Sequence, residues 1–153
     1  TKDQIAIAGL TEVDPTTVPS SLIVRGVGPS DGDTGVIRLD PAKWSPVGTS
    51  GWQYKDDAKV TTSLGVQKIQ LKSGVVGGSM QIKAKGSYWP YAIIGAQQGV
   101  EIFLNIGGET YCAQYGATVT EFTRNEAGAV QGKTSNPPSE CTPVCGNGIQ
   151  ELS

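Results

Sequence analysis

The clearest alternation of apolar and polar positions begins at Val100. Aliphatic residues at 100, 102, 104 and 106 are separated by Glu101, Phe103 and Asn105. A period of two residues is typical of a strand with two distinct faces. The Gly107-Gly108 pair that follows can adopt positive φ without a Cβ clash, as a tight turn requires. The pattern therefore predicts a β-hairpin whose second strand runs to Tyr115.

Shorter apolar, β-branched runs predict further strands along the chain. In the run that begins at Val66, Lys and Gln residues interleave with Ile69 and Leu71, which indicates that one face of this strand is in water. The best helical candidate, Asp40 to Trp44, is one turn at most. The aromatic segment 88–91 is expected to be a loop, and the polar chain from Thr123 onward is expected to lack regular structure. The predicted strands are 3–10, 21–27, 34–39, 52–54, 58–64, 66–72, 75–85 and 117–122.

The number of turn residues supports an all-β fold. The 153 residues include 21 glycines and nine prolines, spread between short β-branched runs. Nine or ten short strands are most simply closed as a β-sandwich, and we expect one of jelly-roll type. The predicted organisation is an N-terminal strand and linker (1–20), a sandwich body (21–123), and an irregular tail (124–153) tied back by a disulfide.

Composition narrows the classes of function. The chain has no histidine, so it lacks the commonest general base and the commonest metal ligand. Its net charge of −2 comes from mixed signs, unlike the basic footprint of a nucleic-acid-binding protein. No apolar run is long enough for a transmembrane helix. We therefore expect no catalysis, cofactor, metal, nucleic acid or membrane span, and the start at Thr1 suggests a processed chain.

Three cysteines suggest how the tail is attached to the body. Cys112 lies in a predicted strand, whereas Cys141 and Cys145 lie in the Pro- and Gly-rich tail. Either Cys112 pairs with one tail cysteine, or all three are free thiols of a cytosolic protein. Two cysteines on a polar tail favour the disulfide and an oxidising compartment. Closing a loop of about 30 residues would contribute roughly 3–4 kcal/mol on the chain-entropy model.

The segment CGNGIQE, from Cys145 to Glu151, resembles the opening of the CGNG-x-x-E repeats of secreted bacterial proteins, the myxococcal cysteine-rich repeats. The chain stops at Ser153, before the further cysteines of such a repeat. The body also resembles an uncharacterised β-domain found beside these repeats. The resemblance implies that Cys145 belongs to the next module, that Cys112 pairs with Cys141, and that the protein is extracellular or at the cell surface; it implies no activity. The matching pieces of the body are W-x-P at 44–46, G-W-x-Y at 51–54 and Y-C-A-x-Y-G at 111–116.

Two acidic turns have the oxygen ligands that Ca²⁺ prefers. The first is Asp31-Gly32-Asp33 with Asp40 nearby, and the second is Asp56-Asp57. The order of ligands in an EF-hand and its terminal Glu are missing. Ordinary Asp/Gly turns are therefore the favoured interpretation of both.

Aromatic residues could form a platform on which sugar rings stack. The six candidates lie at positions 44, 52, 54, 88, 89 and 91. If such a platform exists, Trp44, Tyr88, Trp89 and Tyr91 are the expected ligand-facing residues. The alternative places residues 52 and 54 in the core, with Trp89 covering a sheet end. No carboxylate pair stands out for glycoside hydrolysis.

The predicted first strand suggests a mode of assembly. Ile5 and Ile7 share one face of the strand, and Ala6 and Ala8 share the other. A linker of about ten residues follows, and it reaches roughly 33–36 Å when extended. The strand either folds back onto its own sandwich or is donated to another copy. The sequence thus predicts an extracellular filament or surface-assembly subunit that polymerises by strand donation, with a secreted carbohydrate-binding or adhesion module as the alternative.

Overall fold

The computed structural model describes residues 13–28, 32–49, 51–56, 63–72, 79–116 and 122–132. Several predicted features lie outside these ranges. They include the N-terminal strand with Ile5 to Ala8, the tail cysteines Cys141 and Cys145, Asp31 and Asp57 of the acidic turns, and most of the predicted strand 58–64. The described residues contain ten strands and one short 3-10 turn.

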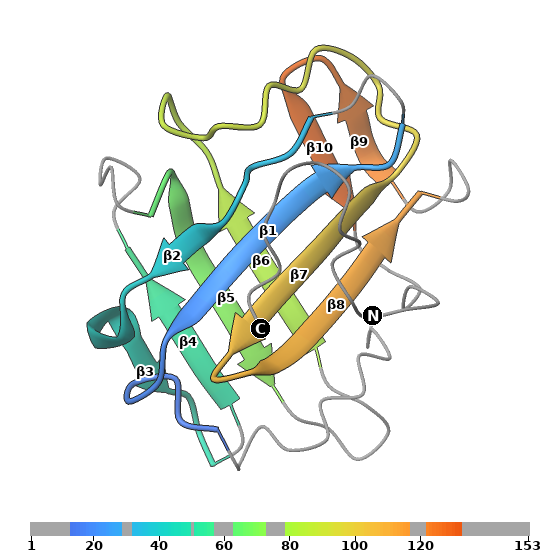
Figure 1. Cartoon of the computed structure of the whole chain (residues 1–153). Helices are drawn as coiled ribbons and strands as arrows, with labels where there is room; N and C mark the ends of the chain where they lie inside the picture. Colours follow the sequence, from blue (N-terminus) through green and yellow to red (C-terminus); the bar gives the residue numbers. More distant parts are fainter. Residues whose placement is uncertain are drawn as a thin grey trace.

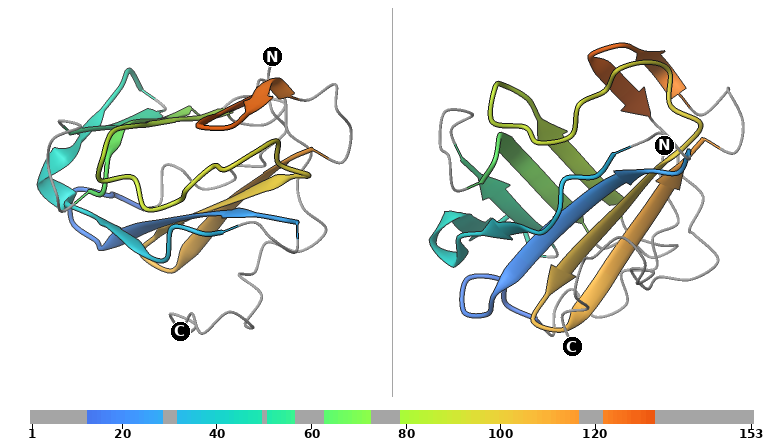
Figure 2. Two further views of the ribbon diagram at one scale, coloured as in Figure 1. Left: turned by 90° about the horizontal axis from the view of Figure 1, so that it is seen from above. Right: turned by 45° about the horizontal axis from the view of Figure 1, so that its top comes forward.

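Eight of these strands form two antiparallel sheets that pack face to face (Figure 1). The left view of Figure 2 shows them nearly edge-on as separate layers. The first sheet has the order β2 (Ile37–Leu39), β1 (Ser20–Gly26), β7 (Val100–Ile106), β8 (Glu109–Tyr115). The second has the order β3 (Trp44–Pro46), β4 (Gly51–Lys55), β5 (Val66–Lys72), β6 (Ser79–Ala84). The turn η1 (Pro41–Lys43) leads from β2 into β3, and a separate hairpin pairs β9 (Phe122–Glu126) with β10 (Ala129–Gly132).

The predicted all-β sandwich is confirmed. Its strand order gives no support to the jelly-roll detail, because β3 to β6 are four consecutive strands that pair in sequence within one sheet. A jelly roll is instead built from two Greek keys. The second sheet is therefore an antiparallel meander.

The core lies between the two sheets and follows the alternation of each strand. Inward residues near the middle of both sheets are fully buried, and their burial is the main source of stabilisation. They are Leu22, Ile37 and Leu104 from the first sheet, and Tyr54, Ile69 and Leu71 from the second. Burial of Tyr54 agrees with the prediction that it belongs to the core.

The hairpin of β7 and β8 forms in the predicted register. Its strands run from Val100 to Ile106 and from Glu109 to Tyr115, and Phe103 lies opposite Cys112. Gly107 and Gly108 have φ of 59° and 99°, values that favour glycine. The local pattern alone was therefore sufficient to define this element.

The prediction of an irregular chain from Thr123 onward is wrong for residues 123–132. Those residues form most of the hairpin of β9 and β10, whose turn contains Gly128 at φ 81°. Only Phe122 and Val130 of the hairpin pack against the main core. The hairpin of β9 and β10 was not predicted because most of its other side chains are polar.

The segment between β6 and β7 is an ordered crossover between the sheets. Figure 1 shows it passing beside the hairpin of β9 and β10. The Gln97 peptide N–H donates to Asn125 Oδ1 at 2.6 Å, and Asn125 Nδ2 donates to Gln97 O at 2.7 Å. Gly128 N–H also donates to Ile93 O at 2.6 Å. These bonds attach the crossover to β9 and to the turn before β10.

Candidate binding surfaces

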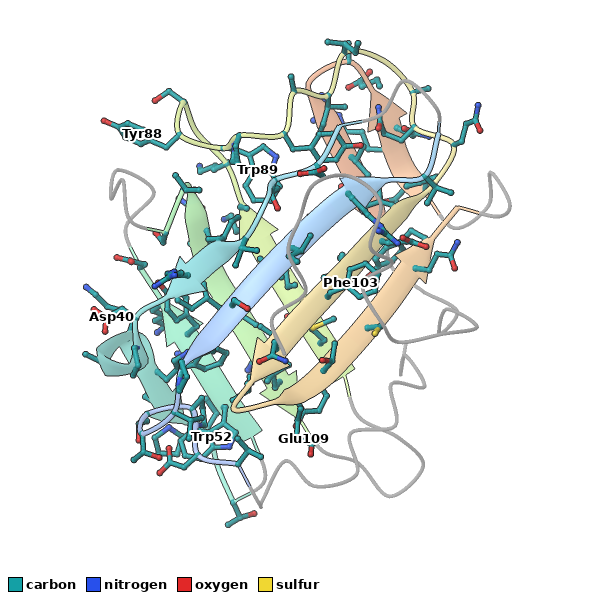
Figure 3. All side chains as sticks on the ribbon, in the orientation of Figure 1. Asp40, Trp52, Tyr88, Trp89, Phe103 and Glu109 are labelled. Atoms are coloured by element: carbon teal, nitrogen blue, oxygen red, sulfur yellow. The ribbon has the colours of Figure 1, made fainter. Side chains whose placement is uncertain are left out.

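The structure separates the four aromatic residues proposed as ligand-facing. Trp44 and Tyr91 are buried, with 5% and 4% of their surface exposed, so the proposed role is wrong for both. Tyr88 is 44% exposed, and Trp89 is partly buried against the core. Figure 3 shows Tyr88 and Trp89 just beyond the end of β6, in the segment that follows Ala84. One exposed ring does not make a stacking platform.

The burial of Trp44 has a specific cause. Its indole N–H donates to Ser20 Oγ at 3.0 Å, and this bond joins the second sheet to the first. Its ring packs against Tyr54 edge-to-face, with centroids 5.4 Å apart. The indole N–H of Trp44 thus has a hydrogen-bond partner inside the core. The residues around Trp44 in the sequence could not predict this partner, because Ser20 lies in a distant strand.

The acidic turns are used for local structure where they are described. Asp40 Oδ1 accepts from Ala42 N–H at 2.9 Å and caps η1, while Asp33 Oδ1 accepts from Gly35 N–H at 2.7 Å. Within the described ranges, no group of three or more Cys, Asp or Glu residues is placed to hold a metal ion.

Asp56 lies in a partly buried polar cluster rather than at a ligand site. The Tyr54 hydroxyl donates to Asp56 Oδ2 at 3.1 Å, and Lys43 Nζ lies 3.6 Å from Asp56 Oδ1. Burial, and then the charge of Asp56, raise the pKa of the Tyr54 phenol well above its ordinary value. Burial and the charge of Glu109 likewise raise the pKa of Tyr111. The Tyr54 phenol therefore stays neutral and acts as a donor, which is a structural role.

Cys112 lies on the outward face of the first sheet. It forms a row across three strands with Phe103 and Ile23, and all three side chains are less than a tenth exposed. Figure 3 shows Phe103 on this face of β7. The disulfide predicted for Cys112 would join it to a tail cysteine, and both tail cysteines lie outside the described residues. The specific pairing of Cys112 with Cys141 is thus still a prediction.

The strand β6 is the long edge of the second sheet. It pairs with β5, and no further strand pairs with it in the described part of the chain. Met80, Ile82 and Ala84 face the core, but Ile82 and Ala84 are only partly buried. The opposite edge, β3, has three residues and ends at Pro46, which cannot donate to a ladder. An edge of six residues with alternating faces is the kind that can pair with another strand.

The outward side of the second sheet carries only polar and basic side chains along its three longer strands. Lys55, Lys68 and Lys83 lie directly opposite one another on β4, β5 and β6, and we call them the lysine row. Gln53, Gln70 and Gln81 form the adjacent glutamine row, and Lys72 lies beyond it on β5. The alternation along β5 predicts a face in water but not these rows, because rows depend on the pairing of strands.

A β-bulge lies next to the lysine row and sets the orientation of Val66. The pairing of β5 with β6 shifts between Val66 and Lys68, so that Gln67 is the extra residue. The shift allows Val66 and Ile69 both to face the core, and it leaves Lys68 opposite Lys83. If the register of Lys68 to Lys72 continued without the bulge, Gln67 would lie opposite Ala84 and Val66 would turn to the outward face, while Lys68 would still lie opposite Lys83.

No protein-family model, curated protein or solved structure matches this chain. Among the described residues, no helix is long and apolar enough to cross a membrane. The features that bear on function are therefore surfaces of the molecule itself, namely the β6 edge and the lysine and glutamine rows.

Proposed function

We propose that the protein is a non-enzymatic, extracellular structural subunit that polymerises by donating its N-terminal strand, residues 3–10, to the β6 edge of another copy. The observation that carries this proposal is the outer edge of β6, with which no other strand of the described ranges pairs. The edge of β8 is not proposed as the acceptor of the donated strand, because Thr110, Cys112 and Tyr115 of β8 have further interactions.

The donor and the edge are complementary in pattern. Inward residues of β6 alternate with outward Gln81 and Lys83. The donor alternates in the same way, with Ile5 and Ile7 on one face. Placed beside β6, these two side chains would extend the core and cover Ile82. Their burial would contribute about 1.5–3 kcal/mol each, in addition to the new main-chain hydrogen bonds.

The symmetry of such a contact determines the assembly. The donor and the acceptor edge are different surfaces, so the interface is heterologous. Repetition of a heterologous contact gives a ring or an open filament, not a two-fold dimer. The predicted ten-residue linker is not an extended tether, because Pro15 is buried and Val13 and Val18 pack against the core of their own subunit. A donated strand would therefore leave its own sandwich just before Val13.

Paired substitutions on the two faces of the donor test the proposal. The variant Ile5→Asp/Ile7→Asp places charges where burial is required, and we expect monomers in sedimentation velocity. The matched control, Ala6→Asp/Ala8→Asp, carries the same charges on the outward face and is expected to polymerise like the wild type. Equal polymerisation of both variants would rule out donation of this strand.

We further propose that Cys141 is the disulfide partner of Cys112. The tail disulfide would hold the end of each subunit to the outward face of the first sheet. Mass mapping under non-reducing conditions should recover a peptide that joins the two residues. Cys141→Ser is expected to lower the thermal midpoint, since the closed loop of about 30 residues is lost. Cys145→Ser serves as the control, and an effect of that variant alone would assign the pairing to Cys145 instead.

A further inference from the structure

The second sheet has an unusual charge distribution for a chain of net charge −2. Its four strands contain four lysines and no Asp or Glu, although the whole chain has 14 acidic residues. None of the four lysines forms an ion pair with a described residue. Lys55, Lys72 and Lys83 are exposed, and Lys68 is half-buried between its neighbours. The outward face of this sheet is therefore a positive surface on an acidic protein.

The alignment of the lysine row has an energetic cost. Like charges that lie directly opposite across strands are destabilising. Lys68 has such a neighbour on both sides, because Lys55 and Lys83 are its partners in β4 and β6. Nothing in the core requires lysine at these three positions, since all three side chains point outward. A bound anion would remove the repulsion.

From this arrangement we infer that the outward face of the second sheet binds a linear acidic polysaccharide. Neighbouring strands lie about 4.8 Å apart, so the lysine row presents positive charges at a short, regular spacing across the sheet. The glutamine row beside it presents amides that donate to and accept from sugar hydroxyls. Ser45, opposite Gln53 on β3, adds a hydroxyl at the end of that row. A polymer with alternating carboxylates and hydroxyls matches both rows.

Other polyanions fit this face less well. Single-stranded nucleic acid is usually held by a basic groove together with aromatic rings on which bases stack. The outward positions of β4, β5 and β6 in these rows are occupied by Lys and Gln only. An anionic membrane would also be expected to take up apolar side chains, which the rows lack. The ligand class named here is distinct from strand donation and uses a different surface of β6.

Binding to polygalacturonate, a linear polyuronate, tests the inference in the full-length protein. We expect saturable binding that weakens at least tenfold between about 0.05 and 0.5 M salt, because exposed charges are screened over a few ångströms at high ionic strength. Neutral dextran should not bind. Equal or tighter binding to a DNA oligonucleotide of the same charge would overturn the assignment to polysaccharide.

Two variants test whether polygalacturonate binding depends on the lysine row or only on the net charge of the protein. Lys68→Gln removes the central charge and is expected to weaken polygalacturonate binding about two- to fivefold, the effect of one surface ionic contact. The control Arg38→Gln removes one exposed charge from β2 of the first sheet and should change affinity less than twofold. Equal losses in both variants would show that binding depends only on net charge, and would overturn the inference.

Stability provides a second readout of the same variant. If the lysine row is retained for a ligand, Lys68→Gln should fold with an unchanged or higher thermal midpoint at low salt, because it removes repulsion. A lower midpoint with unchanged affinity would mean that Lys68 has only a structural role. The native mass of Lys68→Gln should equal that of the wild type, so a failure of polysaccharide binding is distinguishable from a failure of strand donation.

Discussion

At the scale of single residues, buried polar groups determine which aromatic side chains are structural. Trp44 donates to Ser20 across the two sheets, and Tyr54 donates to Asp56 at the sandwich edge. Tyr91 is buried and hydrogen-bonded to Gln97 within the crossover. Each ring thus has a partner for its polar atom, as buried Trp and Tyr residues require. These rings hold the sandwich together and are not available to a ligand.

The raised pKa of Tyr54 predicts how stability depends on alkaline pH. In the unfolded chain a tyrosine loses its proton near pH 10, whereas folded Tyr54 keeps its proton to higher pH. Unfolding above pH 10 therefore releases a proton, and the free energy of unfolding should fall as the pH rises above that value. Urea unfolding at a series of pH values measures this slope.

Tyr54→Phe should make that alkaline slope shallower, because the buried phenol is gone. Below pH 10 the variant is expected to lose about 0.5–1.5 kcal/mol of stability with the hydrogen bond to Asp56. Tyr88→Phe is the matched control, because Tyr88 is exposed. The stability of this variant should fall with rising pH as steeply as that of the wild type. A slope in Tyr54→Phe as steep as in Tyr88→Phe would contradict this account.

Sequence reasoning at this scale failed where burial depends on distant chain segments. Trp44 follows a proline-led turn and was predicted to face a ligand, but its partner Ser20 lies 24 residues away. Asp40 is the opposite case, because its cap is local and an ordinary turn was expected. Local hydrogen bonds are readable from sequence, whereas cross-sheet hydrogen bonds are not.

At the scale of elements, strands with strong alternation and a local turn were the most predictable. The hairpin from Val100 to Tyr115 and the strand from Val66 to Lys72 occur at the predicted positions. The short strand β3 was missed because only its pairing with β4 defines it. The hairpin of β9 and β10 was missed because few of its side chains are apolar. The lysine row escaped prediction because it exists only after three strands are paired.

The contact between Gln97 and Asn125 predicts how one element unfolds. Asn125→Ala removes both hydrogen bonds to the Gln97 peptide, and we expect faster amide hydrogen exchange in 93–99 and 122–132. A loss of about 1–3 kcal/mol of local stability is the usual cost of unsatisfied buried groups. The rest of the sandwich should exchange at its original rate.

Thr123→Ala is the control for this element. The Thr123 hydroxyl donates to Gln131 O within the same hairpin, and this bond is exposed. Its loss should leave exchange in 93–99 unchanged. If both variants accelerate exchange equally, the hairpin and the crossover are not coupled through Asn125.

At the scale of the whole molecule, the two sheets present different surfaces for different partners. On the two proposals made above, the second sheet would offer its β6 edge to a donated strand and its outward rows to an acidic polysaccharide. The first sheet carries Cys112 on its outward face, beside Phe103. Since no related protein guides the interpretation, the two proposals depend on separate measurements of native mass and of polysaccharide binding.

Hydrogen exchange at the β6 edge tests the central claim, strand donation, most directly. The amides of Ser79–Ala84 that point away from β5 should be protected in the full-length chain at concentrations where it polymerises, because a donated strand would bond to them. In a chain lacking residues 1–10 the same amides should exchange rapidly, while those of β5 stay protected. Equal exchange at the β6 edge in both chains would contradict strand donation to this edge.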